Sequence, residues 1–423
     1  MMSEKMSEKM SEKMNVQEKI TEEQNPLGLT PPPTSPRRPR FSLWRVLVGV
    51  LTLAVAWLAV LPAPTDQLWM LAIGVTEWGF VLALVALLPL LPGWRRTRSG
   101  RIGAALGLVA ALLALSPLPR AWLVARRLPA ELDSAFGTAT VKSGPEAVPR
   151  SAPLVMTDLV RGISSPPVQP SSAVYVTREQ PLTLDLYQPP EPHTAAPGVI
   201  VIHGGSWQRY DSTQLAPLNR YLAARGYIVA SINYRLSPAH IFPAARDDTQ
   251  AAIAYLKANA ATLGLDAQRL VLLGRSAGGQ LALLVAYTAQ DPAIRGVISF
   301  YGSSDLRYSY EHPSNPKVID TRGILEAYLG GSPDKVSTAY DAASPINFVS
   351  PGIPPTLLIH GERDELLSMM QSELLDARLI QTGQRHLLLR MPWATHGCDF
   401  NFSGPCGQIS TYAIERFLAA VMK

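Results

Sequence analysis

The chain has 423 residues, of which 47% are hydrophobic, and a formal net charge of +5. This composition is too apolar for a disordered protein, and the length suffices for two or three structural units. The arginines cluster beside apolar stretches near the N-terminus rather than on one basic face, which argues against nucleic acid as a partner. The two cysteines form no C-x-x-C pair and the seven histidines form no H-E-x-x-H motif, so we expect no metal and no other cofactor.

The N-terminal part has the pattern of a tail followed by membrane spans. Residues 1–40 hold three tandem Met-Ser-Glu-Lys repeats and a proline-rich run, which predict a disordered tail. Within residues 41–127, apolar stretches at about 41–61, 67–91 and 102–119 each approach the ~20 residues that a helix needs to cross a bilayer. We therefore expect about three transmembrane helices and a multi-pass membrane protein. A cleaved signal peptide is the alternative, but the long preceding tail and the two further stretches argue against it.

Charge predicts how these spans are oriented. Arginines precede the first stretch and separate the second from the third, which indicates that both segments are cytoplasmic. Three spans then place the rest of the chain outside the cytoplasm. Arginines after the third stretch argue against this, and loss of that stretch, the weakest of the three, would reverse the orientation. Glu77 falls within the second stretch, where it is either protonated or turned toward a partner helix.

A linker and an α/β domain follow. Residues 128–170 are rich in Pro, Ser, Gly and Ala, which is typical of a linker. From residue 171 to 423, short apolar runs alternate with helical patterns, and this alternation predicts a mostly parallel sheet with helices on both faces. We expect strands at 182–187, 199–202, 228–231, 270–273, 297–301, 356–359 and 386–389, and helices at 244–263, 277–289, 366–381 and 411–422.

A serine between glycines follows the fourth of these strands. Gly274-Arg275-Ser276-Ala277-Gly278 fits a strained strand-to-helix turn that exposes the serine hydroxyl. A serine nucleophile needs a base, and the base needs an orienting carboxylate. Asp364 and His396 each follow a later strand, and the order Ser, Asp, His is that of α/β-hydrolases. We predict a catalytic triad of Ser276, Asp364 and His396.

A glycine pair follows the second strand in His203-Gly204-Gly205-Ser206-Trp207. Attack by a serine on a carbonyl creates an oxyanion that needs preorganised N–H donors, and glycines let backbone amides approach the substrate. We assign the backbone amides of Gly205, Ser206 and Ala277 as these donors. Trp207 and Tyr234 are expected to line the substrate site, the segment 303–349 to cover it, and His203 to organise the loop.

Other residues compete for some of these roles. Asp305, Glu362 and Glu365 are rival acids, whereas His360 and His386 border strands and are expected to be structural. Cys398 and Cys406 bracket the loop after His396, and a disulfide and two free thiols remain equally open.

Four segments carry a resemblance to a known family. His203–Trp207, Asn233–Pro238, Phe242–Asp248 and Gly274–Gly279 resemble the hormone-sensitive-lipase and BD-FAE-like branch of α/β-hydrolase esterases over about residues 171–423. The resemblance implies an α/β-hydrolase fold and hydrolysis of carboxylic esters through an acyl-enzyme, with the triad roles on Ser276, Asp364 and His396. Ser206 replaces a glycine of the lipase-like members and is closer to the BD-FAE side, whose members are similar to kynurenine formamidases and feruloyl or acetyl esterases.

Together these patterns predict a membrane-anchored serine esterase that acts on a small-molecule or lipid-like ester. An amidase or formamidase would use the same triad. A membrane protein whose hydrolase-like domain binds a partner or senses a ligand is another possibility, and transport through the spans around Glu77 is a third.

Overall fold

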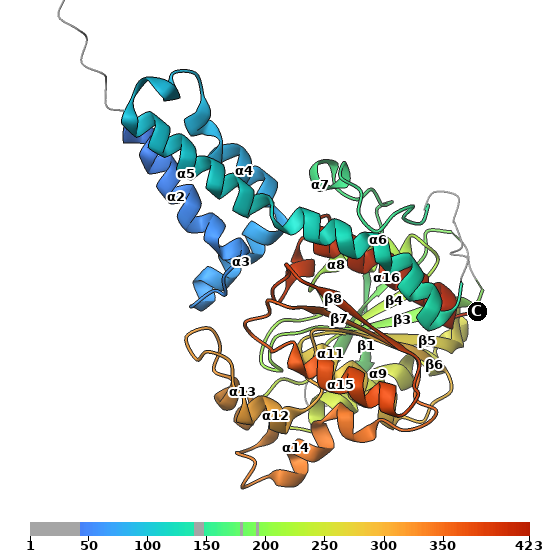
Figure 1. Ribbon diagram of the computed structural model, residues 1–423. Helices are drawn as coiled ribbons and strands as arrows, with labels where there is room; N and C mark the ends of the chain where they lie inside the picture. The colour runs from blue at the N-terminus through green and yellow to red at the C-terminus, as the bar shows by residue number, and fades with distance from the viewer. Residues whose placement is uncertain (1–42, 139–147, 178–180, 192–193) are drawn as a thin grey trace, which may run out of the picture.

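The computed structural model describes residues 43–138, 148–177, 181–191 and 194–423. They form an α/β domain and a bundle of helices that projects from it (Figure 1). The tail predicted for residues 1–40 lies outside the described residues.

One sheet of eight strands forms the centre of the α/β domain. Strand β2 runs antiparallel to both β1 and β4. The six strands β3 to β8 run parallel to one another. The mostly parallel sheet predicted from the sequence is therefore confirmed, and β1 is an additional strand at the edge. The order is β1-β2-β4-β3-β5-β6-β7-β8, with β1 at Ser171–Val176, β2 at Leu182–Tyr187, β3 at Ala196–Ile202, β4 at Ile228–Ile232, β5 at Leu265–Arg275, β6 at Ile294–Phe300, β7 at Thr356–Gly361 and β8 at His386–Met391.

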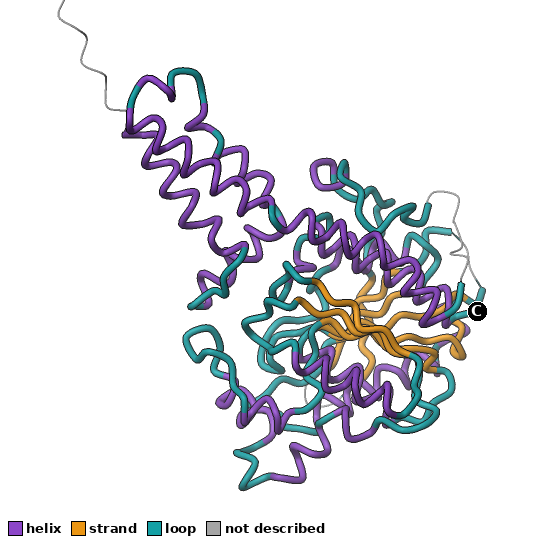
Figure 2. The backbone as a smooth tube through the Cα atoms, in the orientation of Figure 1, coloured by secondary structure: helices purple, strands orange, loops and turns teal. Residues whose placement is uncertain are grey.

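Helices cover both faces of the sheet (Figure 2). Successive side chains of a strand point to opposite faces, so Ile200 of β3 belongs to one core and Val201 to the other. The first core is closed by α9 (Ala244–Ala258), α11 (Ala277–Thr288) and α15 (Met370–Gln381), and the second by α6 (Pro117–Phe136), α8 (Ala216–Ala223) and α16 (Pro405–Val421).

Short elements complete the α/β domain. Between β6 and β7 the chain forms α12 (Leu306–Glu311), α13 (Thr321–Leu329), α14 (Ser337–Ala343) and the 3-10 turn η4 (Pro345–Phe348). The remaining elements are α7 (Asp158–Arg161), α10 (Ala260–Leu263) and η5 (Cys398–Phe400).

The projecting bundle consists of α2 (Leu43–Ala56) with η1 (Trp57–Ala59), α4 (Gly79–Ala86) with η2 (Leu88–Leu90), and α5 (Arg98–Leu115). Its core is built of alanines, among them Ala56, Ala83 and Ala110, which let the helix backbones approach closely. The turn η3 (Trp94–Arg96) lies at the outer end, and α3 (Asp66–Glu77) lies at the end next to the α/β domain.

The three predicted spans differ from the observed helices. The second is broken, because α3 meets the helix Gly79–Leu90 at an angle of 86°. The third continues without a gap into α6, and the joined helix Arg98–Phe136 is the one helix of the described residues that is long and apolar enough to cross a membrane. A second would be added if the bent pair counted as one span, whereas Leu43–Ala59 is shorter.

Helix α6 also shifts the boundary expected at residue 128. Its apolar face, including Val124, Leu128 and Leu132, is buried in the second core of the α/β domain. The segment 117–136 therefore belongs structurally to the α/β domain. The helix was missed because Pro129 stands inside it and prolines flank its start, a pattern that is more typical of a loop.

Candidate active site

Ser276 occupies a sharp turn between β5 and α11. Its backbone lies at φ 53° and ψ −118°, which is a strained conformation for any residue other than glycine. A Cβ at Gly274 would clash with the carbonyl oxygen of Gly278, and one at Gly278 would clash with that of Ile202. The two glycines therefore allow the turn that presents the serine hydroxyl at the carboxyl end of the sheet.

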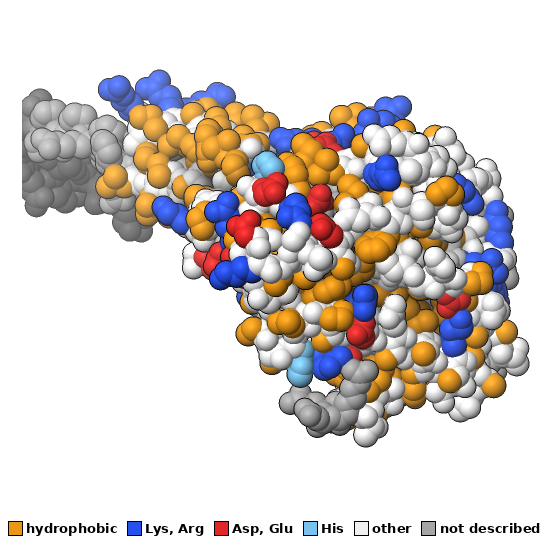
Figure 3. Space-filling model, turned by 90° about the horizontal axis from the view of Figure 1, so that it is seen from below, with side chains coloured by type: hydrophobic (Ala, Val, Ile, Leu, Met, Phe, Trp, Pro, Cys, Tyr) orange, Lys and Arg blue, Asp and Glu red, His pale blue; other side chains and the backbone are white. Residues whose placement is uncertain are grey.

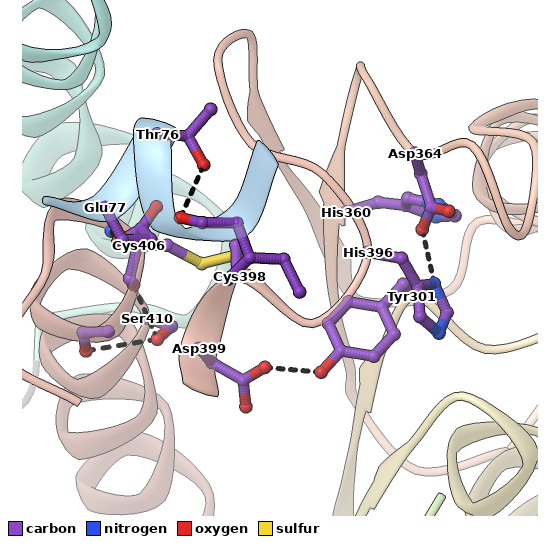
Figure 4. Close-up of a disulfide and its surroundings, with 12 residues drawn as sticks. Thr76, Glu77, Tyr301, His360, Asp364, His396, Cys398, Asp399, Cys406 and Ser410 are labelled. Carbon is purple, nitrogen blue, oxygen red and sulfur yellow. Dashed lines mark hydrogen bonds and ion pairs between the residues drawn. A yellow bond between two sulfur atoms is a disulfide. The ribbon is translucent and has the colours of Figure 1, made fainter. Parts of the chain in front are cut away.

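Asp364 and His396 meet at the same edge. The Nδ1 atom of His396 donates a hydrogen bond of 2.6 Å to Oδ2 of Asp364 (Figure 4). The other carboxylate oxygen accepts the backbone N–H groups of Leu366 and Leu367 at 2.9 and 2.8 Å. His360, the penultimate residue of β7, approaches Oδ2 with Nε2 at 3.2 Å. These contacts hold the carboxylate in one orientation toward the imidazole.

The same contacts keep Asp364 ionised. Its burial favours the neutral acid, but the neighbouring His396 and His360 outweigh that effect, so the pKa of Asp364 lies well below its usual range. A buried carboxylate beside the ring can stabilise a positive charge on the imidazole of His396 during a reaction.

Ser276 and His396 line one cavity of about 480 Å³. This volume is in the range of small-molecule sites. Since Asp364 occupies Nδ1 of the imidazole, Nε2 is the nitrogen that remains to exchange a proton with the serine. The structure thus brings together the three residues that the sequence assigns to a triad.

The loop after β3 supplies amides to the same cavity. Gly205 and Ser206 line it together with Ala277, and both loop residues have positive φ angles, of 110° and 57°. The N–H of Gly204 is engaged by Oε1 of Gln214 at 2.8 Å, whereas those of Gly205 and Ser206 have no acceptor within the described residues. Ala277 is the first residue of α11, where an N–H has no partner inside the helix.

Contacts of His203 and Tyr234 stabilise this loop. Their rings stack with centroids 4.2 Å apart, the Tyr234 hydroxyl donates to the carbonyl of His203 at 3.0 Å, and Nδ1 of His203 lies 2.7 Å from the carbonyl oxygen of Gly204. Burial lowers the pKa of His203 to about 4, so its ring is neutral near pH 7. The organising role expected for His203 agrees with these contacts.

The two aromatic residues expected at the substrate site have different places. Trp207 lines the cavity, although its ring is mostly buried against Tyr328 and its indole N–H donates to Gln280 at 3.1 Å. Tyr234 is 3% exposed and is not among the residues that line the cavity. The structure therefore does not place Tyr234 at the cavity, because its ring stacks on His203 in the core.

The rival acids are engaged elsewhere. Asp305 caps α12 by accepting the N–H of Tyr308 at 2.9 Å, and Glu362 lies 3.5 Å from Nε of Arg390. Glu365 accepts hydrogen bonds from Thr395 and from the N–H of Ala63.

A network around Asp399 was not anticipated from the sequence. Its carboxylate accepts a hydrogen bond from Nε of Arg275 at 2.5 Å. It accepts another from the hydroxyl of Tyr301 (Figure 4), whose ring centroid lies 4.3 Å from that of His396. The preceding residue, Cys398, forms a disulfide with Cys406. The cysteine pair was the one sequence signal that pointed to this loop.

Comparisons with known proteins agree with this fold. Residues 184–379 match the BD-FAE family. Esterase LipC of Mycobacterium tuberculosis is 32% identical over 246 residues, which are 54% of this chain and 60% of that protein. The probable carboxylic ester hydrolase LipM of the same organism is 29% identical over 254 residues, which are 56% of this chain and 58% of that protein.

A solved esterase structure has a similar fold. A hyperthermophilic esterase from the archaeon Pyrobaculum calidifontis superposes with a TM-score of 0.53 at 26% identity, over 60% of this chain and 86% of that one. The chain spans about three fifths of the length of the curated relatives it matches, and the projecting helices lie before the segment that matches the family. Residues 184–379 are thus similar to the BD-FAE family, and the fold of the domain is that of an α/β-hydrolase.

Proposed function

We propose that the protein is a membrane-anchored serine esterase that hydrolyses carboxylic esters through an acyl-enzyme. The observation that carries this proposal is the hydrogen bond between His396 and the ionised Asp364 at the cavity that Ser276 lines. The esterases among its relatives favour an ester over other acyl compounds.

The proposed reaction has two halves. Oγ of Ser276 attacks the ester carbonyl carbon while Nε2 of His396 takes the hydroxyl proton. The oxyanion accepts hydrogen bonds from the free amides of Gly205, Ser206 and Ala277. When the carbon–oxygen bond to the alcohol breaks, the imidazolium returns the proton to the departing oxygen. Water then attacks the acyl-enzyme by the same proton route and releases the acid.

The projecting bundle supports the membrane anchor. Its outer surface carries exposed apolar side chains such as Leu47, Leu84 and Leu112, and Figure 3 shows hydrophobic side chains over much of the bundle. The 18 residues of α5 extend about 27 Å. This length approaches the ~30 Å of the hydrocarbon core of a bilayer.

The orientation we propose puts the α/β domain outside the cytoplasm. The turn η3, which holds Arg95 and Arg96, and the start of α5 at Arg98 lie at the outer end of the bundle, opposite the α/β domain (Figure 1). Positive residues mark the cytoplasmic side. The disulfide between Cys398 and Cys406 supports the same side, because such bonds persist in oxidising compartments. Protease treatment of intact cells tests this, since digestion of the α/β domain only after lysis would contradict it.

Hydrolysis of p-nitrophenyl butyrate by the full chain in detergent tests the activity. We expect Ser276→Ala to abolish it, whereas Ser350→Ala, at an exposed serine, retains it. A Ser276→Ala protein that hydrolyses the ester at the normal rate would refute the proposal. Parallel rates on formamides measure the preference for esters.

A further inference from the structure

Helix α3 of the N-terminal region touches the loop that carries the candidate base. The indole Nε1 of Trp69 donates to the backbone carbonyl of His396 at 3.2 Å, and Ile73 packs beside Gly397. At the end of the helix, Oε2 of Glu77 accepts the N–H of Cys406 at 3.1 Å, next to the disulfide (Figure 4). The carboxyl group that the sequence places within a span is therefore turned toward the α/β domain.

The segment before α3 holds the loop of the candidate acid. Nη1 of Arg363 donates to the carbonyl of Leu58 at 3.1 Å, and Oε1 of Glu365 accepts the N–H of Ala63 at 3.1 Å. At the start of α3, the N–H of Asp66 donates to the carbonyl of Lys317 at 3.3 Å, in the segment between β6 and β7. Helix α3 thus lies at the rim of the cavity, between the loops of the candidate acid and base and residues 303–349, which we call the insert.

This position makes α3 a wall of the cavity. Trp69 and Ile73 both line it, and both side chains are partly exposed rather than buried in the core. Ile324 and Leu325 of α13 provide further apolar lining from the insert, and Phe400, 70% exposed, lies next to the base loop. A hydrocarbon chain placed along these side chains would leave water, and each methylene so buried favours binding about fourfold.

We propose that Trp69 and Ile73 are specificity-determining residues and that the substrate is an ester whose hydrocarbon chain lies against α3. This inference rests on the proposed esterase activity and adds the substrate class: esters of chains longer than acetyl, up to at least eight carbons. The wall comes from outside residues 184–379, so it is not part of the segment that matches the family.

The experiment compares kcat/KM for p-nitrophenyl acetate, butyrate and octanoate, with the full chain in detergent below the substrates' aggregation concentrations. We expect the octanoate-to-acetate ratio to exceed one in the natural protein. Ile73→Ala should lower this ratio about sixteenfold, because the burial of roughly two methylenes is lost. Ile73→Trp should also lower it, since the larger side chain fills the space that a long chain needs.

Met70→Ala is the matched control. Met70 lies on the same helix, is 58% exposed and does not line the cavity, so its replacement should leave the ratio unchanged. Thermal unfolding followed by tryptophan fluorescence verifies that each variant is folded.

The outcomes separate the two proposals. If the natural protein hydrolyses esters and both folded Ile73 variants keep its ratio, the inference about α3 is overturned while the esterase activity stands. If the natural protein hydrolyses none of the three esters, the proposed function falls and the inference falls with it.

Discussion

Opening the disulfide should weaken both the fold and the activity. The bond joins Cys398 and Cys406, which are 8 positions apart, so it closes a short ring directly after the candidate base. For a ring of this size, the entropy removed from the unfolded chain amounts to about 2.5 kcal/mol. This is a substantial share of the roughly 5 to 15 kcal/mol that stabilise a typical domain.

The loop closed by the disulfide also contains Asp399, which binds Arg275 beside the nucleophile and Tyr301 beside the imidazole of His396. When the disulfide is opened, the Asp399 carboxylate is held less firmly in its position. We therefore expect kcat to fall several-fold and KM to change less, because the base is positioned less accurately while the cavity walls remain.

The assay is urea unfolding of the full chain in detergent, followed by tryptophan fluorescence, in oxidised and reduced protein. The double variant Cys398→Ala, Cys406→Ala is the control, since a reductant should then have no further effect. Reduced protein with verified free thiols, but with the unfolding free energy and kcat of the oxidised form, would refute the reasoning.

Three further predictions follow from the site and the core. Asp364→Asn should lower kcat by roughly four orders of magnitude, because an amide cannot stabilise the imidazolium; a loss below tenfold would argue for another acid. Leu128→Ala should lower the urea-unfolding free energy by about 2 to 5 kcal/mol, because this side chain of α6 is fully buried; an unchanged value would mean that α6 is not docked. The pKa of His203 is about 4 in the folded chain and higher in the unfolded chain, so protons favour unfolding as the pH falls from about 6.5 to 4. His203→Phe should remove about 3 kcal/mol of that pH dependence, and an equally steep dependence in this variant would contradict the assignment.

Local patterns in the sequence were sufficient for seven of the eight strands of the sheet. Strands β2 through β8 are short apolar runs, and the prediction located each of them, although their ends differ by a few residues. Strand β1 was missed because it lies at the edge, pairs on one side and is exposed at half of its positions. An edge strand needs no continuous apolar run, so it leaves a weak pattern.

In the candidate site, too, local patterns predicted some residues and not others. The turn around Ser276 is encoded by its own glycines, and Asp364 and His396 could be located because parallel strands end at one edge of a sheet. The position of the Tyr234 ring away from the cavity could not be predicted, because its direction depends on His203, which is 31 positions away.

The role of α3 could not be predicted because its contacts join residues that are far apart in the sequence. The bond between Glu77 and Cys406 joins residues 329 positions apart, and no local pattern encodes such a contact. Apolar composition suggested a straight span, whereas the chain bends by 86° after this residue. A helix that packs on a protein surface and one that crosses a bilayer can have the same apolar content.

Covalent labelling of the full chain with a fluorophosphonate tests the central claim most directly. We expect mass spectrometry of the digested protein to find the phosphonyl group on Ser276, with hydrolysis of p-nitrophenyl butyrate lost in proportion to the labelled fraction. An unmodified Ser276 in protein that hydrolyses the ester, or full hydrolysis by completely labelled protein, would contradict the account.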